Sequence, residues 1–358
     1  MDTTNNKLAP LMQAFFKGAY YTLIFIICTV AAYCFTELLN WLFPPSHIDQ
    51  EKFTFVERIK YFSKLFLSGI TKGSIYALIA LGYTMVYGII ELINFAHGEI
   101  YMLGAYIGFL VAVVLTLLGF PGLAILAIAT VVAIIYCASY GYTIEKVAYK
   151  PLRGAPRLSP LISAIGMSIF LQNYVLMAQT SDFRRFPDLI PDFGFLENVS
   201  SYLQSTDLVI IISSLLVMIG LTMFIQYTRM GKAMRATAQN RKMAMLVGIN
   251  ADKVISMTFL IGSGLAAVGG ILIACDVSQI NHYIGFIAGL KAFTAAVLGG
   301  IGSVPGAMIG GLILGCTESL GTGYIASDYE DVFAFSLLVL ILIFRPSGIL
   351  GKHHLQKV

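Results

Sequence analysis

The chain has 358 residues, of which 58% are hydrophobic and only 12% are charged, and its formal net charge is +4 at pH 7. A soluble protein carries about twice that share of charged residues, because they cover its surface. The composition therefore excludes a soluble multidomain protein, and the small, scattered positive excess is not typical of nucleic-acid binding. We expect an all-α, polytopic membrane protein.

The apolar runs predict about ten transmembrane helices, since a crossing needs about 20 apolar residues. The first run covers residues 18–43, and no clear cleavage site for a signal peptide follows it, so a retained helix is favoured. The later spans are expected at 65–90, twice within 100–144, at 158–181, 208–228 and 254–275, twice within the glycine-rich 284–317, and at 332–344. The five cysteines lie in or beside these runs, so we expect neither a disulfide framework nor a metal site.

The loops between the spans predict the orientation in the membrane. Residues 145–157 and 229–253 are rich in Lys and Arg, whereas residues 182–207 are rich in Asp and Glu. Short basic loops face the cytoplasm. We therefore expect the two basic loops and both termini on the cytoplasmic side, although residues 44–64, which are also basic, then lie outside.

Two segments are expected to be broken or re-entrant helices. Residues 91–99 place polar side chains between two long spans, and residues 291–311 are interrupted at Gly299, Gly300 and Gly302. Irregular backbone at membrane depth occurs where it lines a cavity or is buried in protein, and transporters place substrates beside it. The alternative is close helix packing through small residues. The charged residues at span ends, among them Glu99, are expected to be solvated or paired.

The basic segment 230–248 is rich in Ala, Met, Arg and Lys, which are strong helix formers. We expect one short amphipathic helix, on which Met234, Ala238, Met245 and Leu246 share a face, and which stops at Gly248. Such a helix either lies on anionic lipid or docks a cytoplasmic partner. The sequence itself leaves both possibilities open.

No catalytic constellation stands out, and we expect a protein that is not an enzyme. The two Gly-Lys pairs, at residues 231–232 and 351–352, are not followed by Ser or Thr. A phosphate-binding P-loop is therefore absent from the sequence. If ATP drives this protein, another chain hydrolyses it.

Long, ordered motifs point to one family. Residues 73–106 read GSIYALIALGYTMVYGIIELINFAHGEIYMLGAY, residues 289–315 read GLKAFTAAVLGGIGSVPGAMIGGLILG, and residues 344–351 read FRPSGILG. Together with ISAIGMSIFLQNYV (162–175) and LVGIN (246–250), they closely resemble the permease subunit of high-affinity branched-chain amino acid ABC importers, the LivH type. The resemblance begins near residue 67, so we divide the chain into an extra amino-terminal segment, 1–64, and a permease domain, 65–358.

The resemblance implies one half of a heterodimeric channel in a bacterial inner membrane. Its implied partners are a second related permease, two cytoplasmic ATPase subunits that use the ATP, a periplasmic binding protein for leucine, isoleucine or valine, and membrane lipid; no cofactor is implied in this chain. The loop 229–253 would be the coupling loop, with Arg235, Ala236, Ala238, Arg241 and Gly248 as coupling residues. Polar candidates for the substrate path are Asn94, His97 and Lys291. The alternatives are a urea or short-amide permease, or a stand-alone channel or secondary transporter.

Overall fold

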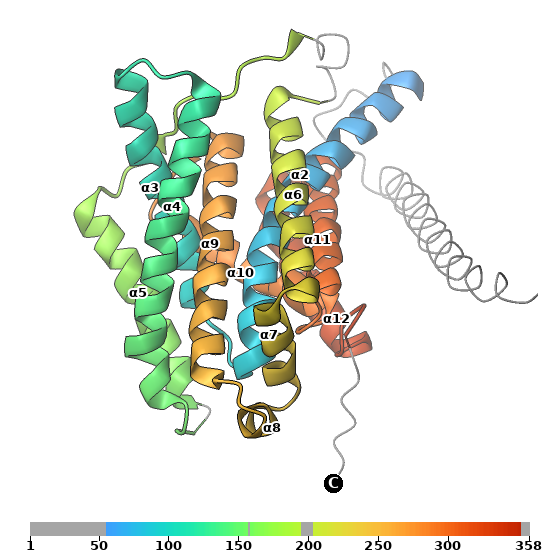
Figure 1. Ribbon diagram of the computed structural model, residues 1–358. Helices are drawn as coiled ribbons and strands as arrows, with labels where there is room; N and C mark the ends of the chain where they lie inside the picture. Colours follow the sequence, from blue (N-terminus) through green and yellow to red (C-terminus); the bar gives the residue numbers. More distant parts are fainter. Residues whose placement is uncertain (1–54, 157, 195–202, 352–358) are drawn as a thin grey trace, which may run out of the picture.

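The computed structural model describes residues 55–156, 158–194 and 203–351 (Figure 1). The prediction of a membrane helix at residues 18–43 lies outside these residues. The described chain is a bundle of helices, and its sheet consists of two short strands, β1 (Arg184–Arg185) and β2 (Gln279–Ile280). The predicted all-α, polytopic architecture is thus confirmed.

Nine helices correspond to the predicted spans after the first. They are α2 (Phe55–Ile90), α3 (Ala96–Leu117), α4 (Gly122–Ile144), α5 (Leu158–Ala178), α6 (Ser205–Tyr227), α9 (Ala251–Val277), α10 (Ile284–Gly299), α11 (Val304–Tyr324) and α12 (Glu330–Phe344). Within the described residues, seven of them are long and apolar enough to cross a membrane. The other two, α10 and α12, have 16 and 15 residues.

Small residues let the central helices approach closely. Helix α2 lies beside α11 in Figure 1, and a Cβ atom added to Gly73 would lie 2.8 Å from the Cα of Leu312. A Cβ added to Gly104 of α3 would lie 2.6 Å from the Cα of Ala267 in α9. Only glycine fits such distances without a shift of the backbone. The glycines therefore set the spacing of the core helices.

The outer helices α5, α6 and α12 expose large apolar side chains. Met177 at the end of α5 is 88% exposed, and Phe344 at the end of α12 is 81% exposed. A surface of this kind is unfavourable in water over such an area, but it suits the hydrocarbon of a membrane. This distribution agrees with the composition of the chain.

Short elements close the two ends of the bundle. At one end β1 pairs with β2 in antiparallel register, and the backbone N–H of Phe186 donates to the carbonyl oxygen of Ser278 at 3.0 Å. At the other end lie a π-helix (Glu145–Tyr149), a 3₁₀ turn (Lys150–Leu152), α7 (Arg229–Gln239) and α8 (Arg241–Leu246) (Figure 1). A further 3₁₀ turn, Ser327–Tyr329, precedes α12.

Candidate translocation path and coupling surface

The first predicted break is present, and its inner end lies inside the protein. Helix α2 ends at Ile90, α3 begins at Ala96, and the side chains of Asn94 and His97 are buried. The hydroxyl of Tyr149 donates to Oδ1 of Asn94 at 2.6 Å. The His97 ring meets the edge of the Tyr83 ring with centroids 4.7 Å apart. The non-helical segment is thus buried in protein at Asn94, whereas Glu91 at its start is exposed.

The second break is a tight turn between α10 and α11. Gly300 and Gly302 have φ values of +105° and +91°, which favour glycine. The backbone N–H groups of Ile349 and Leu350 donate to the carbonyl oxygens of Leu298 and Gly299, both at 2.9 Å. The segment after α12 therefore pairs with the carbonyl groups at the end of α10. This arrangement supports the packing interpretation for Gly299 and Gly300; a role in the substrate path stays a prediction.

The two breaks meet at one small cavity. Its volume is about 10 Å³, and its lining includes Tyr83 of α2, Ile93 of the first break, Phe293 of α10 and Ile301 of the second. That is room for about one water molecule. A cavity of this size admits no amino acid in the conformation described.

Lys291 lies at the centre of an ion-pair cluster in which it and Glu318 are buried. Its Nζ lies 2.5 Å from Oε1 of Glu318, 2.9 Å from Oε1 of Glu330 and 2.9 Å from Oδ1 of Asp331. The cluster joins α10, α11 and α12, and the Lys291 side chain is only 6% exposed. Phe293, two residues further along α10, contacts Tyr83 with ring centroids 6.3 Å apart. Positions two apart face different sides of a helix, so the structure does not bring Lys291 together with His97.

Glu99 corrects the expectation for charges at span ends. It lies in the first turn of α3, but it is 0% exposed, and its Oε1 accepts a hydrogen bond from Oγ of Ser168 at 3.0 Å. Ser168 lies at the middle of α5, a helix long enough to cross a membrane. Glu99 is therefore not a solvated residue. Although it lies near the end of α3, its carboxylate is level with the middle of the neighbouring helix α5.

The basic loop forms two helices instead of the single predicted one. Thr228 caps α7 by accepting from the backbone N–H of Gly231, and Asn240 caps α8 by accepting from that of Met243, both at 3.0 Å. Asn240 has extended backbone, so the chain turns there. The predicted stop is confirmed, since α8 ends at Leu246 and Gly248 has φ +86°.

The two basic loops lie at the same end of the bundle, as predicted. Asp252, at the start of α9, accepts from Nη1 of Arg153 at 2.6 Å and lies 3.4 Å from Nζ of Lys150. Nη2 of Arg241 lies 3.5 Å from the same carboxylate. Arg153 also pairs with the buried Glu145. Asp252 therefore connects α8 to the turn between α4 and α5. That this end of the bundle faces the cytoplasm stays a prediction.

The predicted coupling residues differ in exposure. Arg235, Ala238 and Gly248 are exposed, whereas Ala236 and Arg241 are half-buried. The predicted shared face is wrong, because Met234 is buried in α7 while Leu246 of α8 is 79% exposed. We define the coupling surface as the exposed residues Arg235, Ala238, Met243, Met245, Leu246 and Val247. The sequence predicts Met245 and Leu246 on the shared apolar face but does not single out Met243 and Val247, because the turn at Asn240 reorients α8.

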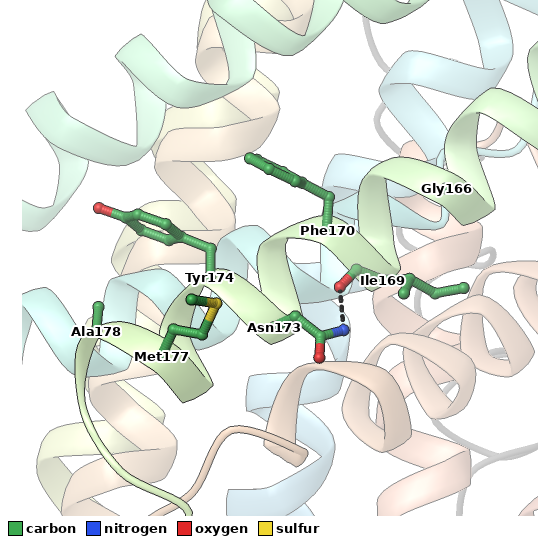
Figure 2. Close-up of a pocket in the computed structure, with 7 residues that line it drawn as sticks. All are labelled: Gly166, Ile169, Phe170, Asn173, Tyr174, Met177 and Ala178. Carbon is green, nitrogen blue, oxygen red and sulfur yellow. Dashed lines mark hydrogen bonds between the residues drawn. The ribbon is translucent and has the colours of Figure 1, made fainter.

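The outer face of α5 is hollowed (Figure 2). A cavity of about 590 Å³ is lined by Gly166, Ile169, Phe170, Asn173, Tyr174, Met177 and Ala178. Asn173 is exposed, and its Nδ2 donates to the carbonyl oxygen of Ile169 on the same helix at 2.8 Å. An amide side chain is unusual on a face that meets only lipid.

The fold and the exposed residues define a polytopic helical membrane protein. At one end of the bundle, it exposes basic and apolar side chains together. A family model described as "Branched-chain amino acid transport system / permease component" matches residues 65–342. The chain belongs to this family of permease components.

Individual relatives agree with this assignment. The high-affinity branched-chain amino acid transport system permease protein LivH of Escherichia coli K12 is 52% identical over 306 residues, covering 84% of this chain and 99% of that protein. BraD of Pseudomonas aeruginosa, another such permease protein, is 52% identical over 307 residues, with the same coverage. The probable LivH of Methanocaldococcus jannaschii is 29% identical over 306 residues, covering 80% of this chain and 92% of that protein.

Proposed function

We propose that this chain is the membrane permease subunit of an ABC importer that moves leucine, isoleucine and valine into the cytoplasm. The observation that carries the proposal is the 52% identity to the E. coli permease over 99% of its length. Identity at this level over a whole permease favours the same substrate class. In this proposal the chain hydrolyses no ATP itself and holds no cofactor.

The proposed ATPase partners dock on the coupling surface. Its basic and apolar side chains stand exposed on α7 and α8, where a partner chain can reach them. The pairing of Asp252 with Arg153 and Arg241 links α8 to α9 and to the turn between α4 and α5. A push on α8 is therefore transmitted to several membrane helices, which suits the rocking movements of transporters.

The proposed second permease packs on the outer face of α5. A neighbouring helix gives the Asn173 amide a hydrogen-bonding partner that lipid lacks. The open space around Gly166 leaves room for close approach, because a Cβ added there would meet nothing within 4 Å. Whether this partner is a related chain or a second copy is decided by the protein that co-purifies.

In this topology the end with α7 and α8 faces the cytoplasm of a bacterium, the chain lies in the inner membrane, and both termini are cytoplasmic. A binding protein delivers the amino acid to the opposite end. The relatives do not favour the alternatives, which are a urea or short-amide permease and a stand-alone channel or secondary transporter.

The test is uptake by cells that lack their own branched-chain amino acid importers and express this chain with its partner subunits. We expect saturable import of radiolabelled leucine that stops when the ATPase P-loop lysine is replaced. Import of urea but not of leucine would show that the substrate is urea and not a branched-chain amino acid. Leucine movement that persists with the inactive ATPase would contradict the ABC class.

A further inference from the structure

Three glutamates of the described chain are completely buried, and one of them differs from the other two. Glu145 pairs with Arg153, and Glu318 pairs with Lys291. Glu99 is equally buried, at 0% exposed, but no Lys, Arg or His of the described residues lies within 4 Å of its carboxylate. Its partner is the neutral hydroxyl of Ser168, on Oε1, while Oε2 has no hydrogen-bond partner.

The unpartnered oxygen faces the amino end of another helix. A Cβ built on Gly285, in the first turn of α10, would lie 2.6 Å from Oε2 of Glu99. No side chain caps this helix at Tyr283. The amino end of a helix carries free N–H groups and partial positive charge, and it attracts anions. Among the described residues, the N–H groups of Ile284 and Phe286 donate to the carbonyl oxygens of Asn281 and Tyr283, so the N–H of Gly285 is the donor left for an anion in the first turn. A carboxylate that can hold a cation and a donor that can hold an anion therefore lie side by side within the bundle.

The surroundings allow these groups to become accessible. Gly98 of α3 packs against Gly289 of α10, where an added Cβ would lie 2.8 Å from the Cα of Gly289. The contact is backbone against backbone, so a substrate reaches these groups only when α10 moves away from α3. Ser168 places the carboxylate level with the middle of α5. A charge there without a cation is costly, and it is typical of a functional site.

We propose that Glu99 and the amino end of α10 form a binding site for a zwitterion in the membrane, in which the Glu99 carboxylate holds the α-ammonium group of the amino acid. The backbone N–H of Gly285 receives the α-carboxylate. This inference rests on the proposed function, because it names how the proposed substrate is held. It also gives a reason for selecting an amino acid over urea, which has no ammonium group.

The test compares Glu99→Gln, Glu99→Asp and a control, Glu91→Gln, in the leucine uptake assay at limiting leucine. Glu91 is an exposed carboxylate at the start of the same break. We expect E99Q to lower uptake about tenfold or more, E99D to retain part of it, and E91Q to match the parent. The amide keeps the hydrogen bond with Ser168, so we also expect E99Q to accumulate in the membrane and melt at the parent temperature or above.

Each other outcome overturns the inference. Parent-like uptake by E99Q would mean that a neutral group suffices at this position. Failure of E99Q to accumulate, or a lower melting temperature, would make the carboxylate a structural partner of α10. If the parent chain itself imports no leucine, the proposed function fails, and the inference that rests on it fails too.

Discussion

Nζ of Lys291 and Oε1 of Glu318 lie 2.5 Å apart, and both side chains are buried between α10 and α11. Glu330 and Asp331 at the start of α12 complete the set of acids around the same ammonium group. The cluster fastens three helices at one point. It explains why a lysine is tolerated in an apolar segment without assigning it to the substrate path.

Replacing Lys291 by Met leaves Glu318 buried without its cation. We expect the variant to lose about 3 to 5 kcal/mol of stability and to accumulate poorly, because an uncompensated buried charge is strongly unfavourable. The double variant Lys291→Met, Glu318→Gln should recover part of the loss. Lys72→Met is the control in the same melting assay, because Lys72 pairs with Glu330 at 3.9 Å but is 28% exposed, and an exposed ion pair contributes little. A stable K291M chain that no longer transports would instead place Lys291 in the path.

Introducing an acidic side chain into the apolar part of the coupling surface tests the docking of the ATPase subunits. We expect Leu246→Glu, and separately Ala238→Glu, to remove the ATPase subunits from the purified complex, since a buried unpaired carboxylate disfavours the interface. Both residues are exposed, so the amount of chain in the membrane should stay unchanged. Asp188→Ala, at the opposite end, is the control. Parent amounts of ATPase with both glutamate variants would refute the docking assignment.

The glycine spacing of the core predicts different effects for the same substitution. Gly104→Ala places a methyl group 2.6 Å from the Cα of Ala267, whereas Gly220→Ala on α6 meets nothing within 4 Å. We expect the first to cost about 1 to 3 kcal/mol through overpacking. The second should be neutral or stabilising by up to about 1 kcal/mol, as alanine is the better helix former. Equal melting temperatures would show that α3 and α9 separate more easily than described.

The amide on the outer face of α5 tests the contact with a second permease. We expect Asn173→Leu to lower the amount of second permease that co-purifies, because it removes the polar group offered to the neighbouring helix. Met177→Leu, on the same face, should leave the amount unchanged. The single chain should remain stable, since Asn173 bonds only within α5 among the described residues. An unaltered complex would mean that this face meets lipid.

The sequence predicts the membrane helices well because length and apolarity decide them. The break around Asn94 and His97 is likewise visible, since polar residues interrupt two long apolar runs. The turn at Asn240 is not visible in the sequence. Strong helix formers surround Asn240, and an Asn caps a helix only when its own backbone leaves the helical conformation.

The partners of the buried charges require the fold. Glu318, Glu330 and Asp331 reach Lys291 only when α10, α11 and α12 pack together. Glu99 sits at the end of its own helix, and only the placement of Ser168 and Gly285 from other helices shows that it is buried at depth.

The most direct test of the central claim is to tag this chain in its native membrane, purify it in mild detergent and identify the proteins that accompany it. The proposed function predicts a second permease chain and P-loop ATPase subunits in near-stoichiometric amounts. A lone chain or homo-oligomer that still moves leucine, without any ATPase, would contradict it.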